Sequence, residues 1–522
     1  MATVPSLVLS RPRQLSVGVL AALLAILATI TVVSALATML LRKELDYGEP
    51  IVYGDAARLL QGEALYQPID RQPFTVAAYT PLYYWVAAGL RIVVGPGFAP
   101  GRALSLVAGI VSAILLGYIA AVQTRTRWAG VFAASMFLAL AFPGSYASWL
   151  ALYRVDLLGV ALSVGTIVVL SQGTTRLHLM VAALLAGLAV LTKQTFFAAI
   201  LAGTLWLTTV RLRKASLFAC VALLTILLVA ALLQWSTSGA FFANTVLANA
   251  NPISRETAAY QFQQLRGIEG VPALLALLFI LYTRAWTSQS LRLIVIYWLA
   301  SLISVAAIVK IGANHNYWIE FAGATAILAT LCVWTSLRAI RRPPLSVLSM
   351  VPIWLLAAHL GALVPARLIA PPRADLSPPE WTLHADEIAR RFVLDREVGD
   401  LDSLLRQEPG EILAEPLDAV VRVDRPILLE PFLYSILEND GLWDSRPLVA
   451  DICSGKVSLL IIGYPIDADL YPVGLPAYPM WPRTVMSALR ASMVLESHEA
   501  GRSWLYRPRA SLKPDAGGAC GQ

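Results

Sequence analysis

The sequence predicts an α-helical membrane protein that crosses the bilayer about eleven times and carries a small soluble α/β domain at its carboxyl end. Hydrophobic residues make up 57% of the 522 residues and charged residues only 14%, whereas soluble domains are roughly 45–50% apolar. Apolar segments recur up to residue 366, after which the composition becomes mixed and charged. We therefore expect a transmembrane domain at 1–366 and a soluble domain at 367–522.

The predicted spans follow the apolar runs, although several are shorter than the roughly 20 residues that an untilted span needs. The first run lies behind Arg11 and Arg13, as in a signal peptide, but it continues to about Leu41. That is too long for the core of a signal peptide, so we expect an uncleaved first span. The predicted spans are 15–41, 102–122, 128–145, 155–171, 179–192, 195–210, 215–234, 271–284, 291–309, 316–335 and 345–366.

The segment YTPLYYWVAAGLRIVV, residues 79–94, decides the orientation of every later span. If it lies along the membrane surface, the loops on the N-terminal side hold 13 basic residues and no Asp or Glu, counting Arg11 and Arg13. Cytoplasmic loops carry such an excess of Lys and Arg. We therefore expect a juxtamembrane helix at 79–94, a cytoplasmic N-terminus and an extracytoplasmic soluble domain, in a multi-pass protein of the cytoplasmic (inner) membrane. The loops concerned are 124–127, 172–178, 211–214, 284–292 and 338–342.

The formal net charge of +7 is unevenly divided along the chain. Residues 1–366 hold 24 Lys and Arg against 10 acids, and the tail holds 16 against 23. The basic excess therefore belongs to membrane loops and does not indicate a nucleic-acid partner. The cysteines show no metal-binding spacing, and a disulfide between the two in the tail is left open. They are Cys220 and Cys332 in apolar spans, and Cys453 and Cys520 in the tail.

Acidic residues gather directly after the first span, in the stretch ELDYGEPIVYGDAARLLQGEALY. Asp46 and Glu49 lie in the turn LDYGEP, and Pro50 suits the first turn of an amphipathic helix at about 50–62. Further along, three acids are expected to face solvent: Asp55, Glu63 and Asp70. Asp46 and Glu49, fixed between a span exit and a helix start, are the candidate catalytic carboxylates.

Other polar residues interrupt the apolar pattern and are expected at the same outer face, where charged groups are costly unless paired or functional. Each also has a plainer interpretation. Arg154 and Asp156 could be a local ion pair, Lys193 a snorkelling lysine at a turn, and His315 an ordinary loop histidine. The candidate substrate-binding residues are Arg154, Asp156, Lys193, Gln194, His315, Asn316, Tyr317 and Glu320.

These residue types suit one kind of chemistry. A carboxylate can act as general base on an acceptor hydroxyl or amine, and Arg and Lys can hold a phosphate leaving group. The combination fits glycosyl transfer from a lipid-linked sugar phosphate, and no Gly-rich nucleotide motif is evident. No cofactor is indicated with certainty, and a divalent metal held by Asp46, Glu49 and Asp156 is left open.

The sequence resembles the GT-C superfamily of membrane glycosyltransferases, in the group of the protein O-mannosyltransferases and the lipid A aminoarabinose transferase. Four features of residues 15–335 carry the resemblance, in the family's order: LDYGE with the helix AARLLQGEALY; YTPLYYW followed by GFAPGRALSLVAG; LYRVDLLGVALS; and LAVLTKQTFFAA. The sequence departs from the family at Tyr79, Thr80 and Pro81, where one proline stands for two and the preceding basic residue is missing. This departure puts phosphate contact from that segment in doubt.

The resemblance implies an inverting transfer from a polyprenyl-phosphate sugar to a lipid, glycan or protein acceptor at the outer face. The catalytic acid then maps best to Asp46, with Glu49 as the other candidate. Donor-phosphate contacts would fall to Arg154, Lys193 and His315, of which Lys193 alone rests on a motif match.

In the tail, we expect strands at 419–429 and 457–466 with a helix at 431–443 between them. The loop 236–270 is either a second interfacial helix or lid, or a plain connection. Two other functions are weighed. A transporter or lipid flippase should carry ionisable or Gly/Pro-broken elements near the bilayer midplane, which the predicted spans lack. A non-catalytic scaffold for the cell envelope should tolerate the loss of Asp46.

Overall fold

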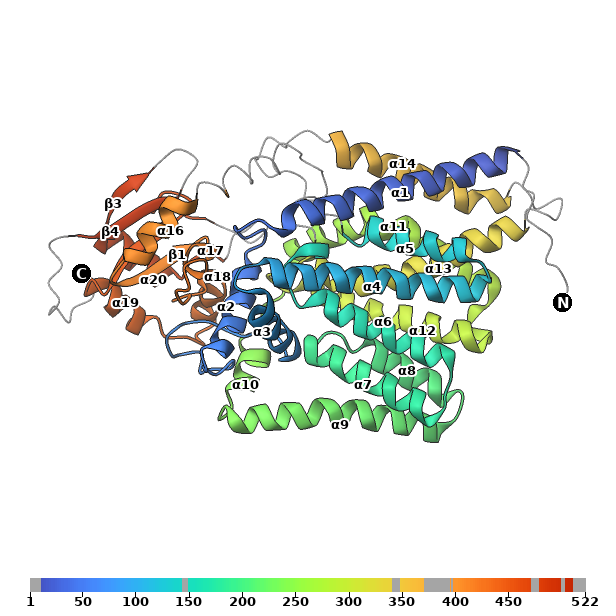
Figure 1. Ribbon diagram of the computed structural model, residues 1–522, viewed down its shortest axis with the longest axis horizontal. Coiled ribbons are helices and arrows are strands. Elements are labelled where there is room, and N and C mark those ends of the chain that lie inside the picture. The colour runs from blue at the N-terminus through green and yellow to red at the C-terminus, as the bar shows by residue number, and fades with distance from the viewer. Residues whose placement is uncertain are drawn as a thin grey trace.

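The structure is a computed structural model that describes residues 11–142, 149–339, 348–369, 395, 398–470, 478–498 and 503–509. Figure 1 shows long helices packed side by side and an α/β domain at one end of this bundle. Two short helices from the loop after α1 lie between the bundle and the α/β domain. Helix α1 begins at the opposite end of the bundle.

Eleven bundle helices each overlap one predicted span. Six of them are long and apolar enough to cross a membrane. They are α1, α4, α9, α11, α12 with the adjoining short helix η4 (Ala306–Val309), and α13 with the adjoining short helix η5 (His315–Trp318). The chain is therefore a multi-pass membrane protein in fold, but the count of about eleven spans is not confirmed. The helices are α1 (Arg11–Met39), α4 (Ala99–Thr124), α5 (Arg127–Leu140), α6 (Asp156–Gln172), α7 (Arg176–Thr192), α8 (Ala198–Thr208), α9 (Leu212–Ser236), α11 (Arg255–Thr283), α12 (Gln289–Val305), α13 (Ile319–Ala339) and α14 (Val351–Ile369).

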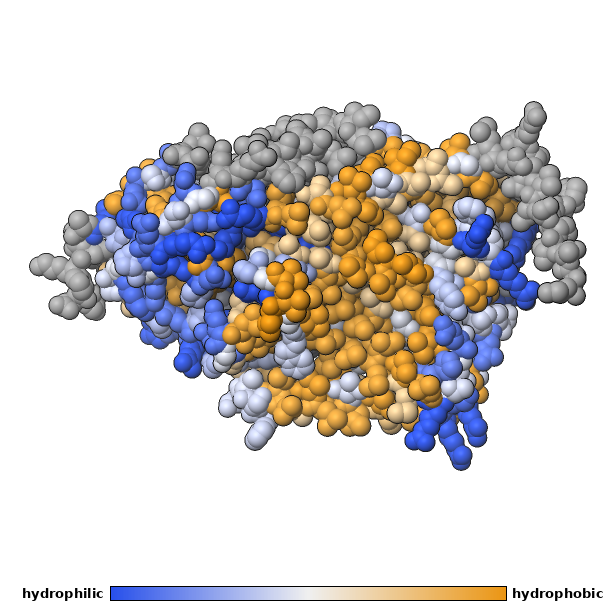
Figure 2. Space-filling model, in the orientation of Figure 1, coloured by the Kyte–Doolittle hydropathy of each residue, from blue (hydrophilic) through white to orange (hydrophobic). Residues whose placement is uncertain are grey.

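The hydrophobic surface agrees with this arrangement. In Figure 2 an apolar belt covers the helical bundle, and polar surface covers the α/β domain and parts of the opposite end. Helix α9 is the least buried of these six helices. Only 11% of its most apolar 18-residue stretch is packed inside the protein. The predicted boundary at 366 falls in the last turn of α14, and the residues from 370 to 394 lie outside the described part, so the boundary stays a prediction.

The loop after α1 forms the two short helices α2 (Gly48–Leu60) and α3 (Leu82–Val94). Pro50 lies in the first turn of α2, as expected. With 13 residues, α3 is about 20 Å long, which is less than the roughly 30 Å of hydrocarbon in a bilayer. It lies beside α2 at the end of the bundle that faces the α/β domain (Figure 1). Its length and place favour the interpretation of 79–94 as a juxtamembrane helix.

The predicted loop 236–270 is largely helical. It contains α10 (Ala240–Phe242), the π-turn η2 (Ala243–Leu247) and the first half of α11, which starts sixteen residues before the predicted span at 271. The side chain of Asn244 accepts from the Ala77 amide at 3.0 Å and donates to the Gln67 carbonyl at 2.7 Å. This segment is therefore anchored on the first loop.

The soluble domain contains a four-stranded sheet of order β1-β2-β4-β3. Strands β1 and β2 are parallel, and β4 runs antiparallel to both of its neighbours. The small α/β fold of the tail is as predicted. Its elements are α16 (Val398–Gln407), β1 (Glu411–Glu415), α17 (Asp418–Val421), α18 (Pro431–Asn439), α19 (Arg446–Cys453), β2 (Val457–Ile462), α20 (Arg483–Ser492), β3 (Met493–His498) and β4 (Trp504–Pro508).

Strand β2 and helix α18 confirm two predicted elements, but the strand expected at 419–429 is wrong. Its first residues belong to α17, which packs against α2, and the remainder is an extended connection. The true neighbour of β2 is β1, with the sequence EILAE. No strand was predicted over this five-residue segment. Of the tail cysteines, Cys453 is disulfide-bonded and Cys520 lies outside the described residues.

The soluble domain is held directly on the first loop by backbone pairing. The Phe74 amide donates to the Leu428 carbonyl at 2.8 Å, and the Glu430 amide donates to the Phe74 carbonyl at 2.9 Å. The Asp418 amide also donates to the Glu44 carboxylate at 3.1 Å. These contacts place the segments after β1 next to the loop that carries Asp46.

Candidate active site

Glu49 is completely buried, and hydrogen-bond donors of the surrounding protein occupy its carboxylate. Its two oxygens accept from Arg102 at 2.8 and 2.6 Å, from the Tyr153 amide at 2.7 Å and from the Leu45 amide at 2.7 Å. Arg102, also 0% exposed, donates to three backbone carbonyls at the end of α1. Both carboxylate oxygens are thus occupied, so the geometry argues against Glu49 as the general base.

Asp46, three residues earlier, is placed differently. One of its oxygens accepts from the Gly48 amide at 3.0 Å and lies 3.4 Å from an Arg154 nitrogen. Its side chain keeps 22% of its surface exposed. Burial raises the pKa of Asp46, and the Arg154 guanidinium opposes that rise. Asp46 is therefore a partly accessible carboxylate beside a cation, and its raised pKa brings it closer to the range that suits a general base.

Arg154 lies between Asp46 and Tyr79, an aromatic residue that was noted in the sequence only for its place in a motif and was not a candidate site residue. Its second terminal nitrogen donates to the Tyr79 hydroxyl at 3.0 Å, and its guanidinium lies 5.1 Å from the centre of the Trp149 ring. A Cβ on Gly48 would stand only 1.3 Å from an Arg154 nitrogen. The missing side chain at Gly48 thus leaves the space that the guanidinium fills.

Lys193 and Asp156 form a second pair. Lys193 donates to Asp156 at 2.8 Å, and Asn316 donates to the same oxygen at 3.0 Å. Lys193 is 2% exposed, so it is not a snorkelling lysine. Among the described ion pairs, Asp156 pairs with Lys193, and Arg154 pairs with Asp46. The local ion pair between Arg154 and Asp156 is therefore not formed.

Tyr79 and Tyr317 connect the two pairs. The ammonium of Lys193 lies 4.2 Å from the ring centre of Tyr317 and 5.5 Å from that of Tyr79. A further cation, Lys310, was not named among the candidates, although it directly follows the predicted span 291–309. Burial, and then repulsion from Lys193, lowers the pKa of Lys310. The site therefore gathers three cations around two carboxylates.

Three predicted site residues have other surroundings. Gln194 donates to the carbonyls of Ala78 and Thr245, at 2.9 and 2.8 Å, and so anchors the segment next to Tyr79. His315 is buried against the Trp318 ring, with 4.7 Å between ring centres. Glu320 accepts from Ser163 and from Tyr297 within the bundle. Thus Asn316 and Tyr317 reach the cation cluster, whereas the described contacts of Gln194, His315 and Glu320 do not include it.

A three-carboxylate metal site is not supported. Among the described residues, no three His, Cys, Asp or Glu side chains form a group that could hold a metal ion. Glu49 is bound to Arg102, and Asp156 to Lys193.

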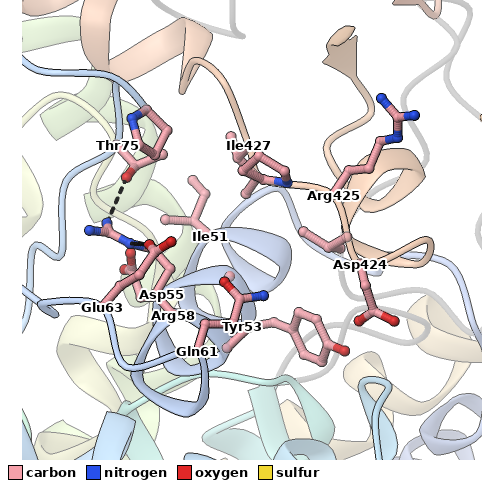
Figure 3. Close-up of a pocket in the computed structure, with 15 residues that line it drawn as sticks. Ile51, Tyr53, Asp55, Arg58, Gln61, Glu63, Thr75, Asp424, Arg425 and Ile427 are labelled. Atoms are coloured by element: carbon pink, nitrogen blue, oxygen red, sulfur yellow. Dashed lines mark hydrogen bonds and ion pairs between the residues drawn. The ribbon is translucent and has the colours of Figure 1, made fainter. Parts of the chain in front are cut away.

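Figure 3 shows a separate cavity between α2 and residues 421–427 of the soluble domain. Asp55 lines this cavity and is only 2% exposed, so the expectation that it faces solvent is wrong. The soluble domain covers this face of α2, and burial raises the pKa of Asp55 to about 7. Glu63 and Asp70 are exposed, as expected.

The comparisons with known proteins identify the fold. No protein-family model and no curated protein matches the chain. ArnT from Cupriavidus metallidurans, in the apo state, matches with a TM-score of 0.57 and 15% identity, over 94% of this chain and 98% of that one. The chain has the GT-C fold.

Two further GT-C structures are similar. ArnT bound to undecaprenyl phosphate gives a TM-score of 0.56 at 15% identity, with the same coverage of both chains. The archaeal oligosaccharyltransferase AglB from Archaeoglobus fulgidus, in complex with an inhibitory peptide and a dolichol-phosphate, gives 0.49 at 13% identity, over 86% of this chain and 69% of that one. The resemblance inferred from the sequence motifs is confirmed for the GT-C fold.

Proposed function

We propose that the protein is a membrane glycosyltransferase that transfers a sugar from a polyprenyl-phosphate donor to an acceptor at the outer face of the membrane. The observation that carries this proposal is the partly exposed Asp46 beside Arg154, whose partner Tyr79 also lies next to the Lys193 ammonium. A GT-C structure with undecaprenyl phosphate bound lends support, because it shows a lipid phosphate held by a protein of this fold.

The cations would receive the leaving group. When the bond between the anomeric carbon and the phosphate oxygen breaks, its electron pair stays on the phosphate, which gains negative charge. Arg154 offers a planar fork of donors and Lys193 a point charge. Asp156 and Asn316 fix the Lys193 side chain before the reaction, and such preorganised charge in a largely buried site stabilises the transition state strongly.

Asp46 would act on the acceptor. Its carboxylate would take the proton from an acceptor hydroxyl or amine while that atom forms a bond to the anomeric carbon. Attack on the face opposite the departing phosphate inverts the configuration. The Arg154 guanidinium opposes the rise that burial causes in the pKa of Asp46, and Gly48 allows the two side chains to lie close together.

The first test of this function is transfer of a radiolabelled sugar by the purified protein in lipid, from a panel of polyprenyl-phosphate hexoses and pentoses. We expect turnover of at least one donor, either to an added acceptor or to water. Donor binding without any turnover across the panel would contradict the enzyme and favour the flippase.

The orientation is also a proposal: the N-terminus in the cytoplasm, and the site and soluble domain outside. The connection between α8 and α9 and the first turn of α9 carry Arg211, Arg213 and Lys214, and they lie at the end of the bundle opposite the soluble domain (Figure 1). This fits the positive-inside bias. The disulfide at Cys453 fits an oxidising compartment for the soluble domain.

Cysteine labelling tests the orientation directly. In a background without Cys220 and Cys332, an impermeant maleimide added to intact cells should label Asp70→Cys and should not label Thr126→Cys until the membrane is opened. Both variants sit in connections outside the long helices. The reverse pattern would place the proposed site in the cytoplasm and contradict the use of a donor at the outer face.

A further inference from the structure

The soluble domain has its own crevice at the carboxyl ends of its two parallel strands. Glu415 is the last residue of β1, and Tyr464 follows the end of β2 by two residues. In open sheets with parallel strands, ligands bind in the crevice outside these carboxyl ends. A cavity of about 260 Å³ lies there. It is smaller than the roughly 300–1,000 Å³ of sites for drug-sized ligands, so it suits a ligand of about one sugar ring.

The aromatic residues of this crevice are fixed by a buried carboxylate. The Trp481 indole nitrogen and the Tyr464 hydroxyl both donate to one oxygen of Glu415, the latter at 2.9 Å. Trp481 is 2% exposed and Glu415 is 9% exposed. Because both donors meet at one buried acceptor, the two rings are held in place without a ligand.

A partly exposed ion pair of Arg490 and Asp469 forms another part of the lining. Arg490 donates to the Ile466 carbonyl at 2.9 Å and to the Asp469 carboxylate at 2.7 Å. It thereby joins α20 to the loop after β2. Arg483 and Ser487, on the same helix, also line the cavity and are exposed. The lining therefore offers both donors and acceptors of hydrogen bonds in fixed positions.

The crevice lies close to the outer loops of the membrane domain. Tyr478, three residues before Trp481, packs in an apolar cluster with Phe432, Ile436 and Ile311, and Ile311 lies in the connection between α12 and α13. The Phe432 amide in turn donates to the Tyr47 hydroxyl at 3.2 Å. Tyr47 is the neighbour of Asp46, so a chain of direct contacts joins the crevice side of the soluble domain to the proposed base.

We propose that this crevice binds one sugar ring of a saccharide acceptor. The inference rests on the proposed glycosyl transfer and specifies a saccharide as the acceptor. A carboxylate and a guanidinium side by side match the donors and acceptors of neighbouring sugar hydroxyls. Asp469 offsets the charge of Arg490, so this pair suits sugar hydroxyls, and Arg483 adds a second positive charge to the lining that would favour a sugar carrying a carboxylate. Holding one ring here would position the rest of the saccharide near Asp46.

Binding is measured without any donor, so that it does not depend on catalysis. Full-length protein in lipid nanodiscs is titrated, by ligand-observed NMR, with the methyl glycosides of glucose, galactose, mannose, N-acetylglucosamine and glucuronic acid. We expect at least one to bind at millimolar concentration, and the variant Asp469→Asn/Arg490→Gln to weaken that binding at least tenfold. Ser487→Trp, which adds bulk to the cavity lining, should block binding by steric exclusion.

A matched control is available on the same domain. Asp444 and Arg446 form an exposed pair with the same 2.7 Å separation as Asp469 and Arg490, and Asp444→Asn/Arg446→Gln should leave binding unchanged. Absence of binding for all five glycosides, or binding that survives both crevice variants, would overturn the inference. Saccharide binding by a protein that turns over no donor would keep the crevice as a binding site and reject the proposed transfer.

Discussion

Replacing Asp46 with asparagine should lower sugar transfer by roughly 10²–10⁴-fold, the usual contribution of a general base, while donor binding stays within a few fold. The amide keeps the size of the side chain and can still accept from the Gly48 amide. It cannot take the proton from the acceptor. The measurements are initial transfer rates with the best donor of the panel and equilibrium binding of the same donor to the variant in nanodiscs.

Asp70→Asn is the matched control, because Asp70 is an exposed carboxylate from the same loop and should be replaceable without effect. Asp46→Glu should retain more activity than Asp46→Asn. Since burial raises the pKa of Asp46, its base form is lost as the pH falls through that raised pKa. The wild-type rate should therefore decline at a higher pH than for an ordinary carboxylate. Full transfer by Asp46→Asn would remove Asp46 from the reaction.

The sequence alone could identify the region of the site because polar residues are conspicuous in apolar surroundings. Asp46, Arg154, Asp156 and Lys193 all stood out in this way. Their pairing could not be predicted, because it depends on contacts between residues 37 to 108 positions apart. Local spacing suggested an ion pair of Arg154 with Asp156, whereas the fold gives each of them another partner.

Asp46 and Glu49 could not be separated for the same reason. Both lie in one short turn after the first span, and nothing nearby distinguishes them. The difference arises from Arg102, which the fold brings onto Glu49 from 53 residues away. Tyr79 was noted for its place in a motif, but its contacts with both cations emerge only when α6 and α7 pack beside the first loop.

The fold was predicted most reliably where hydrophobicity is continuous. Each apolar run corresponds to a bundle helix, since a membrane favours uninterrupted apolar helices. The sequence left the first half of α11 open, as a helix or a plain connection, because it is rich in polar residues, including Gln261 and Gln264. These two side chains are nonetheless buried, against other parts of the protein. Periodicity also failed for β1, which is only five residues long.

Breaking the Glu49–Arg102 pair should impair folding more than chemistry. Removing one partner of a buried ion pair leaves the other charge without compensation and costs about 3–5 kcal/mol. Both side chains are 0% exposed, so solvent cannot compensate for the loss. We expect Glu49→Gln and Arg102→Met each to lower the thermal stability of the purified protein and its yield in the membrane. The measurement is the melting temperature in lipid nanodiscs.

The double variant distinguishes a structural role from a catalytic one. Glu49→Gln/Arg102→Met removes both charges, so it should be less destabilised than the sum of the two single variants, and the difference measures the coupling between the partners. Its transfer rate per folded molecule should remain well above that of Asp46→Asn. If Glu49→Gln instead folds with wild-type stability and loses transfer to the level of Asp46→Asn, then Glu49 takes part in the chemistry and its contact with Arg102 must open during the reaction.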